Sequence, residues 1–369
     1  MVAIGDALAQ MHLDIVGLQE LYSEDDRRLV MEGAASGGLV HTRYFPSGAI
    51  GSGLLMLSRF PIQEASFLRF RLNGRPQELL RSDYYAGKGV ARLRLETPLG
   101  PLDAYDTHLV AGYGEIGSDI YYYHRLAQAY ELARYVATQS RDVPVIVTGD
   151  LNTTPDRLPY RACTALGQLT DSFWMANPGD AGITVTTDIP YVPVHAPERI
   201  DYILYRGGPG DTLRVLSSEV TLKAAPPGAP CSEPPSRGRI AARAYSDHYG
   251  VCTTFEWVTG APGTPSPEID ASVLAAVRQA LEEGVQRAHG DQQSSWIRAG
   301  VAGLLSVILL AARSKTPISR RAFLRGLAAV ISAGLLLAGG VTLSLGFQLS
   351  KEEQILRQLL DELGQTYAL

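Results

Sequence analysis

The stretch Val145-Ile146-Val147-Thr148-Gly149-Asp150-Leu151-Asn152 decides the fold of this chain. Its β-branched apolar residues predict a buried strand, and the polar residues that follow Gly149 mark the end of that strand. Asp150 and Asn152 are alternate residues, and strand side chains repeat every second residue, so both can point into one cleft. The stretch therefore predicts a strand that carries a carboxylate and an amide to a site at its end.

Three further motifs have the same form, in which apolar strand-type residues are followed by polar side chains: Gly17–Glu20 (GLQE), Asp106–His108 (DTH) and Ser246–His248 (SDH). Another run, Arg199–Tyr205 (RIDYILY), places Asp201 in a further apolar segment. Each motif alone occurs by chance in many proteins, as a surface carboxylate, a core histidine or a turn cap. The ordered set indicates a metal-dependent phosphoester hydrolase.

Phosphodiester hydrolysis explains why the acidic and amide residues are needed together. The reaction requires a hard cation, an acceptor for the proton of the attacking water and donors for the charge that develops on phosphorus. Glu20 is predicted to bind Mg²⁺, with Mn²⁺ as a substitute, because magnesium sites commonly use one or two carboxylates. Asp247 is predicted to approach the same metal. Asp150 is predicted to orient the water, and Asn152 to donate to a phosphate oxygen.

The histidines supply the proton transfers that this reaction needs. Imidazole titrates near working pH, so His248 is predicted to be the general base and His108 the donor to the transition state. Asp201 is a carboxylate that can hold His248 in the right tautomer. Together with the acidic and amide residues they define an enzyme site made from five separate parts of the chain.

The ordered motifs resemble the endonuclease/exonuclease/phosphatase superfamily, whose members share the DNase I fold. The resemblance implies a four-layer α/β/β/α sandwich of two mixed sheets with helices outside. From about Asp14 to Trp257 the chain is most similar to the neutral sphingomyelinases, especially the membrane enzymes with two spans. The stretches that carry this likeness are Ile50–Leu54, Leu57–Ile62, His108–Leu109, Asp119–Tyr121 and His124–Ala133.

The resemblance implies Mg²⁺-dependent, phospholipase C-type hydrolysis of a sphingolipid, with sphingomyelin, cleaved to ceramide and phosphocholine, as the favoured substrate. The alternatives are a DNase I-like nuclease or another phosphoesterase, and an inactive membrane-anchored adaptor. His124 and Arg125 begin an amphipathic helix, where they either serve the site or form a solvated face. In the neutral sphingomyelinases an Asp–Lys pair five residues apart switches access to the site. Asp83 and Lys88 have this spacing, and the alternative for them is a charged surface loop.

The beginning of the chain departs from the superfamily pattern. Members begin with a strand that carries an Asn or Asp beside the metal, and a helix follows. Here residues 2–10 already have the pattern of the first helix, so the first strand is expected to be missing. Either the chain is truncated at its N-terminus or part of the sheet is lost, and the second case is what makes the inactive adaptor a rival.

The composition of the chain limits the kinds of binding partner and the cellular compartment that we expect. A net charge of -5 argues against a nucleic-acid partner, because phosphate backbones are bound through basic surfaces. Cys163, Cys231 and Cys252 are odd in number and lack metal-binding spacing, so they are predicted to be free thiols in a reducing compartment. No secretory signal precedes the first motif.

The sequence after Trp257 predicts a membrane anchor. Residues 299–312 are short for a membrane span, and a buried core helix is the alternative there. Residues 326–347 would form a helix of about 33 Å, enough for a hydrocarbon core of about 30 Å. The predicted divisions are a phosphodiesterase domain (1–257), a linker (258–265), an amphipathic helix (266–298), a membrane hairpin (299–347) and a helical tail (348–369).

The topology of this hairpin has conflicting signals. The loop between the apolar runs is basic and contains no acid, which by the positive-inside rule would place it in the cytosol and the catalytic domain on the other side. Free cysteines and the missing signal favour a cytosolic catalytic domain on an intracellular membrane, such as the endoplasmic reticulum, with the basic loop binding anionic phospholipid. The tail can form a homo-oligomer or lie on a membrane, and the sequence does not choose. The basic residues are Arg313, Lys315, Arg320, Arg321 and Arg325.

Overall fold

The structure is a computed structural model that describes residues 1–78, 81, 83–113, 119–186, 197–224, 226–227, 244–260, 269–313 and 321–367. The chain forms two compact units. The first consists of Met1–Gly74 with Arg81–Val277, and the second of Arg75–Leu80 with Arg278–Leu369. Cys231, most of the expected linker, and Lys315 and Arg320 of the basic loop lie outside the described residues.

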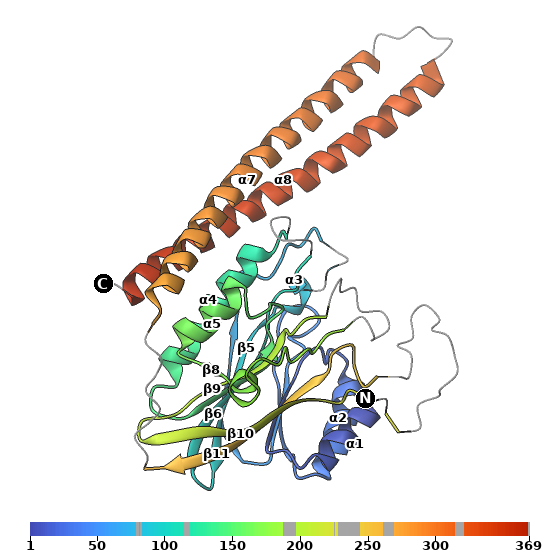
Figure 1. Cartoon of the computed structure of the whole chain (residues 1–369). Coiled ribbons are helices and arrows are strands. Elements are labelled where there is room, and N and C mark those ends of the chain that lie inside the picture. The colour runs from blue at the N-terminus through green and yellow to red at the C-terminus, as the bar shows by residue number, and fades with distance from the viewer. Residues whose placement is uncertain are drawn as a thin grey trace. The chain divides into compact units, whose positions relative to one another are not determined.

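A six-stranded mixed sheet forms the centre of the first unit (Figure 1). All its neighbouring strands are antiparallel except β6 and β7, which are parallel and are connected through helix α4 (Tyr122–Gln139). A crossover helix is the usual way to join parallel neighbours. In sheet order the strands are β4 (Ile62–Arg69), β5 (Gly89–Thr97), β6 (Gly100–His108), β7 (Val145–Asp150), β9 (Asp201–Arg206) and β8 (Thr170–Asp171).

Two smaller antiparallel sheets accompany it. One has the order β1-β3-β2 and the other pairs β10 with β11. Among the described residues β1 pairs only with β3, β11 pairs only with β10, and no strand precedes helix α1, as the sequence predicted. These elements are β1 (Ile15–Leu18), β2 (His41–Tyr44), β3 (Leu55–Ser58), β10 (Asp211–Thr221), β11 (Gly250–Thr259), α1 (Val2–Gln10) and α2 (Glu24–Ala35).

Strand β3 shows how the layers are held together, because all four of its residues are buried. Leu55 and Leu57 pack with α1 and α2, whereas Met56 packs with residues of β5 and β6. Alternate side chains therefore face a helical layer on one side and the large sheet on the other. On the opposite face of the large sheet, Tyr135 of α4 makes an edge-on ring contact with Tyr105 of β6.

Helix α5 (Leu158–Gly167) packs beside α4 and completes the outer layer. The predicted apolar face of α4 is confirmed, since Leu126, Ala129, Ala133 and Val136 are all buried. Two short helices, α3 (Asp83–Ala86) and α6 (Ser172–Ala176), lie between the strands in sequence. The arrangement is the expected α/β/β/α sandwich.

The second unit is dominated by two long helices, α7 (Ala271–Arg313) and α8 (Arg321–Thr366). The helices are antiparallel, because the contact partners in α8 come later along the chain as the residues of α7 come earlier. The Trp296 and Phe347 rings meet edge to face at 4.9 Å, and His289 Nδ1 lies 3.1 Å from Glu353 Oε2. The amphipathic segment and the first apolar run expected as separate parts are thus one continuous helix, as are the second run and the tail.

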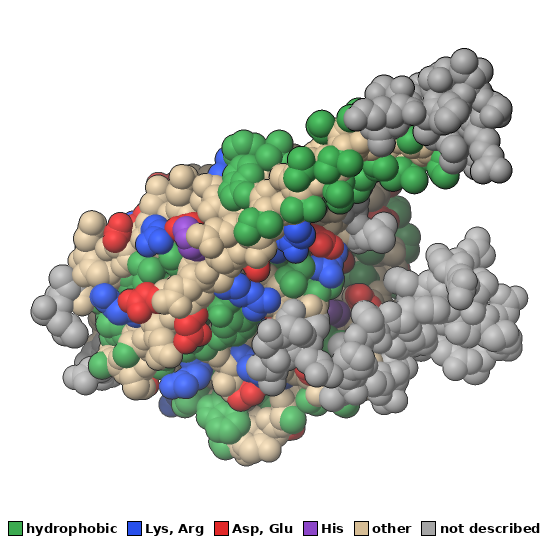
Figure 2. All heavy atoms as spheres, turned by 90° about the horizontal axis from the view of Figure 1, so that it is seen from above, with side chains coloured by type: hydrophobic (Ala, Val, Ile, Leu, Met, Phe, Trp, Pro, Cys, Tyr) green, Lys and Arg blue, Asp and Glu red, His purple; other side chains and the backbone are tan. Residues whose placement is uncertain are grey.

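Both helices are long and apolar enough to cross a membrane. Only 11% of the most apolar window of each helix is buried, which is unlike a core helix of a soluble protein. Hydrophobic side chains cover the described part of the hairpin (Figure 2). Between residues 299 and 347 the most exposed of the described hydrophobic side chains are Leu304, Val307, Val330 and Leu337.

Candidate active site

Three neighbouring strands end level with one another and bring three predicted residues together. In the strand register His108 of β6 lies beside Asp150 of β7, and Asp150 lies beside Asp201 of β9. Each is the first or last residue of its strand, where the ladder stops and the side chains meet loops instead of a sheet face. The sequence motifs therefore converge at one edge of the large sheet.

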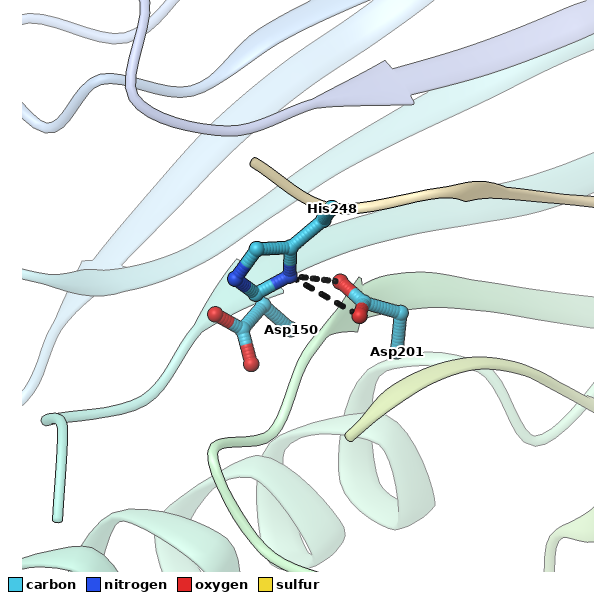
Figure 3. A group of neighbouring side chains, drawn as sticks. All are labelled: Asp150, Asp201 and His248. Carbon is cyan, nitrogen blue, oxygen red and sulfur yellow. Dashed lines mark hydrogen bonds and ion pairs between the residues drawn. The ribbon is translucent and has the colours of Figure 1, made fainter. Parts of the chain in front are cut away.

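His248 completes this cluster from the segment before β11. Its Nδ1 lies 2.9 and 3.1 Å from the two carboxylate oxygens of Asp201 (Figure 3). Burial alone would lower the pKa of His248, but the hydrogen bond and charge of Asp201, with the charges of Asp150 and Asp247, raise it to about 10. The second ring nitrogen lies on the side of Asp150. Asp201 thus fixes the tautomer that leaves Nε2 for chemistry.

Asp150 is the buried acid of the site. Burial and then the charge of Asp201 raise the pKa of Asp150 to about 7. The Asn152 amide and backbone hold it: Asn152 N donates to Oδ1 at 2.7 Å and Nδ2 to Oδ2 at 3.1 Å. Asn152 Nδ2 also donates to Leu109 O at 2.9 Å, so both of its amide protons have acceptors. Asn152 has φ 47°, a left-handed conformation that asparagine tolerates better than most residues.

Lys88 and Asp83 form a buried ion pair at the same edge. Each residue is only 2% exposed, which rules out the charged surface loop. The Lys88 ammonium has three protons and three acceptors: Asp83 Oδ1 at 2.7 Å, His108 Nε2 at 2.8 Å and Leu109 O at 2.9 Å. Burial would raise the pKa of Asp83, but Lys88 and the hydrogen bond from Tyr113 outweigh it and lower that pKa.

His108 is held as a neutral ring. Burial, and then the charges of Lys88 and His248, lower its pKa well below the ordinary value. Because Nε2 accepts from Lys88, the ring proton is assigned to Nδ1, which has no hydrogen-bond partner among the described residues. Asp150 Oδ2 at 3.3 Å and Glu20 Oε1 at 3.9 Å approach the same Nε2. In this arrangement Nε2 of His108 is a hydrogen-bond acceptor, whereas its predicted role is that of a donor to the transition state.

The two predicted metal ligands are the exposed carboxylates of the site. The Glu20 side chain is 63% exposed, and Asp247 is also exposed. The pKa of Glu20 is raised, first by partial burial and also by the charge of Asp247, against the opposing charges of Lys88 and His248. Asp150, Asp201 and His248 form a separate group whose ligand atoms lie within 4.8 Å of one another, but the last two are already paired.

A polar network behind Glu20 was not predicted. Gln19 Nε2 donates to the buried Asp106 Oδ1 at 2.6 Å, and Thr148 Oγ1 donates to the same oxygen at 2.9 Å. Gly17 makes room for it, because a Cβ there would lie 2.1 Å from Thr148 Oγ1. The glycine in the first motif is the sequence signal for such a close approach.

His124 and Arg125 are buried, so the solvated face expected as one alternative is wrong. His124 Nδ1 accepts the N–H of Gly74 at 3.0 Å. Arg125 pairs with Asp119 and donates to Val110 O at 3.2 Å, two residues beyond His108. Both residues therefore hold loop backbone, His124 at Gly74 and Arg125 at Val110.

Comparison of the chain with known proteins identifies its family. The model of the Endonuclease/Exonuclease/phosphatase family matches residues 1–248. The inositol phosphosphingolipids phospholipase C of Schizosaccharomyces pombe is 42% identical over 176 residues, which are 47% of this chain and 41% of that protein. Sphingomyelin phosphodiesterase 2 of Homo sapiens is 35% identical over 231 residues, covering 59% and 53% respectively. The chain spans about half the length of the curated relatives it matches.

Two solved structures share the fold. The crystal structure of SmcL gives a TM-score of 0.50 at 20% identity and covers 67% of this chain and 90% of that one. The crystal structure of D. rerio TDP2 complexed with a single-strand DNA product gives 0.52 at 17% identity and covers 69% and 91%. At this identity the likeness shows the sandwich and nothing about the substrate.

Proposed function

Because the chain belongs to the endonuclease/exonuclease/phosphatase family, we propose that it is a metal-dependent, phospholipase C-type hydrolase of a sphingolipid phosphodiester. The favoured substrate is sphingomyelin, cleaved to ceramide and phosphocholine. The observation that carries the proposal is the hydrogen-bonded Asp201–His248 pair beside Asp150, where Asp150 and Asp201 lie at two aligned strand ends. The relatives that act on sphingolipids supply the substrate class.

The donor set suits a hard divalent cation. Glu20 and Asp247 offer exposed carboxylates, and among the described residues no thiolate lies in the site. Such oxygen ligands favour Mg²⁺, with Mn²⁺ as a substitute, over zinc. A cation held there supplies positive charge that opposes the proton on His248 and polarises a phosphate oxygen.

His248 is the general base in this proposal. Asp201 holds the Nδ1 proton, so the lone pair of Nε2 faces the side of Asp150 and can accept a proton from water. Asp150, kept in place by Asn152, orients that water. Lys88 Nζ donates to His108 Nε2 in the proposed tautomer, so the proposal gives the role of positive charge toward the phosphate to Lys88 and not to His108.

The hairpin is the proposed membrane attachment, in an intracellular membrane with the catalytic domain in the cytosol. The exposed apolar side chains of α7 and α8 support it, because they have no cover among the residues of their own unit. A phosphodiester at the headgroup plane then lies within reach of an anchored enzyme. The basic loop between the helices is proposed to attract anionic lipid. Binding of the full-length protein to anionic vesicles should then weaken as salt rises.

The test is phosphocholine release from sphingomyelin micelles by the full chain, with Mg²⁺ and with EDTA. Inositol phosphosphingolipid and single-stranded DNA are run as parallel substrates. We expect turnover of sphingomyelin that stops in the chelator. Turnover of the inositol lipid alone would show that the proposed headgroup is wrong. Turnover of DNA alone would show that the protein is a nuclease. Undiminished rates in EDTA would show that the reaction does not need the metal.

A further inference from the structure

Thr184 is a buried residue between α6 and β9. It hydrogen-bonds to the segment that contains Asp201 and to the segment that contains His248. Its Oγ1 accepts the N–H groups of Ile200 at 3.2 Å and Asp201 at 3.4 Å. Its backbone carbonyl accepts the N–H of Tyr249 at 2.8 Å. Thr184 is 0% exposed, so no water competes for these contacts. One residue thus contacts the backbone that carries Asp201 and the backbone next to His248.

This double contact matters because the sheets do not fix the pair. Asp201 begins β9 of the six-stranded sheet, whereas His248 precedes β11 of the two-stranded sheet, and no ladder joins these strands. Among the described residues a second bridge is made by Ser172, between Ile203 O and Thr253 Oγ1, further along both strands. Thr184 is the bridge at the end where the pair lies.

The backbone of Thr184 is itself fixed. Its N–H donates to Glu198 O at 3.0 Å, and the next residue, Val185, exchanges two hydrogen bonds with Glu198. The hydroxyl therefore cannot follow Asp201 if the start of β9 shifts. Because the backbone of Asp201 is held in this way, its two carboxylate oxygens stay 2.9 and 3.1 Å from His248 Nδ1.

We propose that Thr184 is a positioning residue that sets the distance between the Asp201 and His248 segments and so aligns His248 for proton transfer. The inference rests on the proposed hydrolase function. The positioning role requires the hydroxyl oxygen of Thr184 and not the shape of its side chain. Loss of that oxygen should lower the rate of the chemical step and leave substrate binding in place, because displacement of a catalytic group by a fraction of an ångström affects the transition state most.

The test uses the full chain in detergent with sphingomyelin micelles and three variants. Thr184→Val keeps the shape and the backbone contacts but removes the acceptor. We expect kcat to fall by about tenfold or more, with KM within about twofold of wild type. Thr184→Ser retains the oxygen and should recover most of the rate. Thr253→Val removes a hydroxyl of the same kind from the distal bridge, and we expect its kcat to stay near wild type.

A double variant distinguishes positioning from general loosening. If Thr184 acts through Asp201, Thr184→Val should cost much less in an Asp201→Asn background than in wild type. An equal loss in both backgrounds, or a Thr184→Val enzyme with normal kcat, overturns the proposal.

Hydrogen exchange at Ile200 and Asp201 gives a readout that does not depend on activity. It should speed up in Thr184→Val and not in Thr184→Ser; unchanged protection would also overturn the inference. An inactive wild type refutes the proposed function instead, and the exchange result then still decides whether Thr184 holds this segment.

Discussion

Lys88 Nζ lies 2.8 Å from His108 Nε2, and the other two protons of this ammonium point to Asp83 and Leu109 O. A lysine with all three protons satisfied inside the protein is fixed in place. It also affects the chemistry of its neighbour, since burial and then the lysine charge lower the pKa of His108, and the lone pair of Nε2 accepts from Lys88. The role of His108 therefore depends on where Lys88 is.

We expect Lys88→Met to destabilise the fold, because it leaves the buried Asp83 carboxylate without its cation. Removal of one partner from a buried pair costs about 3–5 kcal/mol. The matched control is Lys88→Met with Asp83→Asn, which removes both charges and should recover more than half of the loss. Urea denaturation gives the free energy of unfolding of each. A double variant less stable than the single one would contradict this account of the pair.

The same pair predicts a sensitivity to acid. Burial raises the pKa of Asp83, but the charge and hydrogen bond of Lys88 outweigh burial, so the folded pKa lies below the ordinary value of 3.8. The pair therefore stabilises the fold fully above that value and loses its effect as pH falls through the folded pKa. We expect the stability difference between wild type and Asp83→Asn to be larger at pH 7 than at pH 3. An equal difference at both would show that Asp83 is not ionised in the fold.

His248→Ala should lower kcat by at least about a hundredfold, the usual scale of general-base catalysis. Asp201→Asn should cost less, because the ring remains and only its orientation is lost. Steady-state kinetics on micelles measure both, and circular dichroism checks that each variant folds. The assignment of the base fails if His248→Ala keeps a near-normal kcat.

Glu20→Gln should raise the Mg²⁺ concentration needed for half-maximal activity, since an amide is a weaker ligand for a hard cation than a carboxylate. Activity is titrated with Mg²⁺ from an EDTA-treated stock. Glu24→Gln is the control, because Glu24 is an exposed carboxylate in the first turn of α2, four residues away in sequence. Equal Mg²⁺ curves for the two variants would remove Glu20 from the metal site.

A chain that ends at Val277, the end of the first unit, should separate chemistry from location. All proposed catalytic groups precede it, whereas the proposed role of the hairpin is only to concentrate the enzyme at lipid. We expect the shortened protein to be soluble, to keep its kcat on detergent micelles within about twofold and to lose much of its rate on vesicles. Loss of micelle activity in a folded chain would instead make the hairpin part of the active enzyme.

The convergence of the motifs could be predicted because it depends on strand ends, which apolar runs reveal. Asp150 and Asp201 were expected in one site, and their cross-strand pairing follows from two strands that meet at a common edge. The pairing of His248 with Asp201 was expected for a chemical reason. These features need only the sequence of each strand and the charge of each group.

The hydrogen-bonding roles of the Asn152 amide and the His108 imidazole could not be predicted in the same way. Asn152 was expected to donate to phosphate, yet both of its protons are used by Asp150 and Leu109. His108 was expected to be a donor, yet it accepts from Lys88. Both outcomes depend on the path of the loop after His108, and no periodic pattern encodes that path.

The length of the two long helices α7 and α8 could not be predicted from the sequence pattern either. Residues 266–298 and 299–312 differ in composition, so they were divided, but the change from polar to apolar residues contains no proline that would stop the backbone. One helix therefore continues through both. Thr184 could not be identified from the sequence, because its hydroxyl and its carbonyl contact two segments that are distant from each other in sequence, at Ile200–Asp201 and at Tyr249.

The parallel pairing of β6 and β7 sets the order in which the protein can be assembled. His108 reaches Asp150 only after the intervening chain has formed its crossover, because parallel neighbours cannot be joined by a tight turn. Asp201 and then His248 follow later along the chain. Asp150 and Asp201 therefore precede His248 in synthesis, and a growing chain that has not yet reached residue 248 lacks the Asp201–His248 pair.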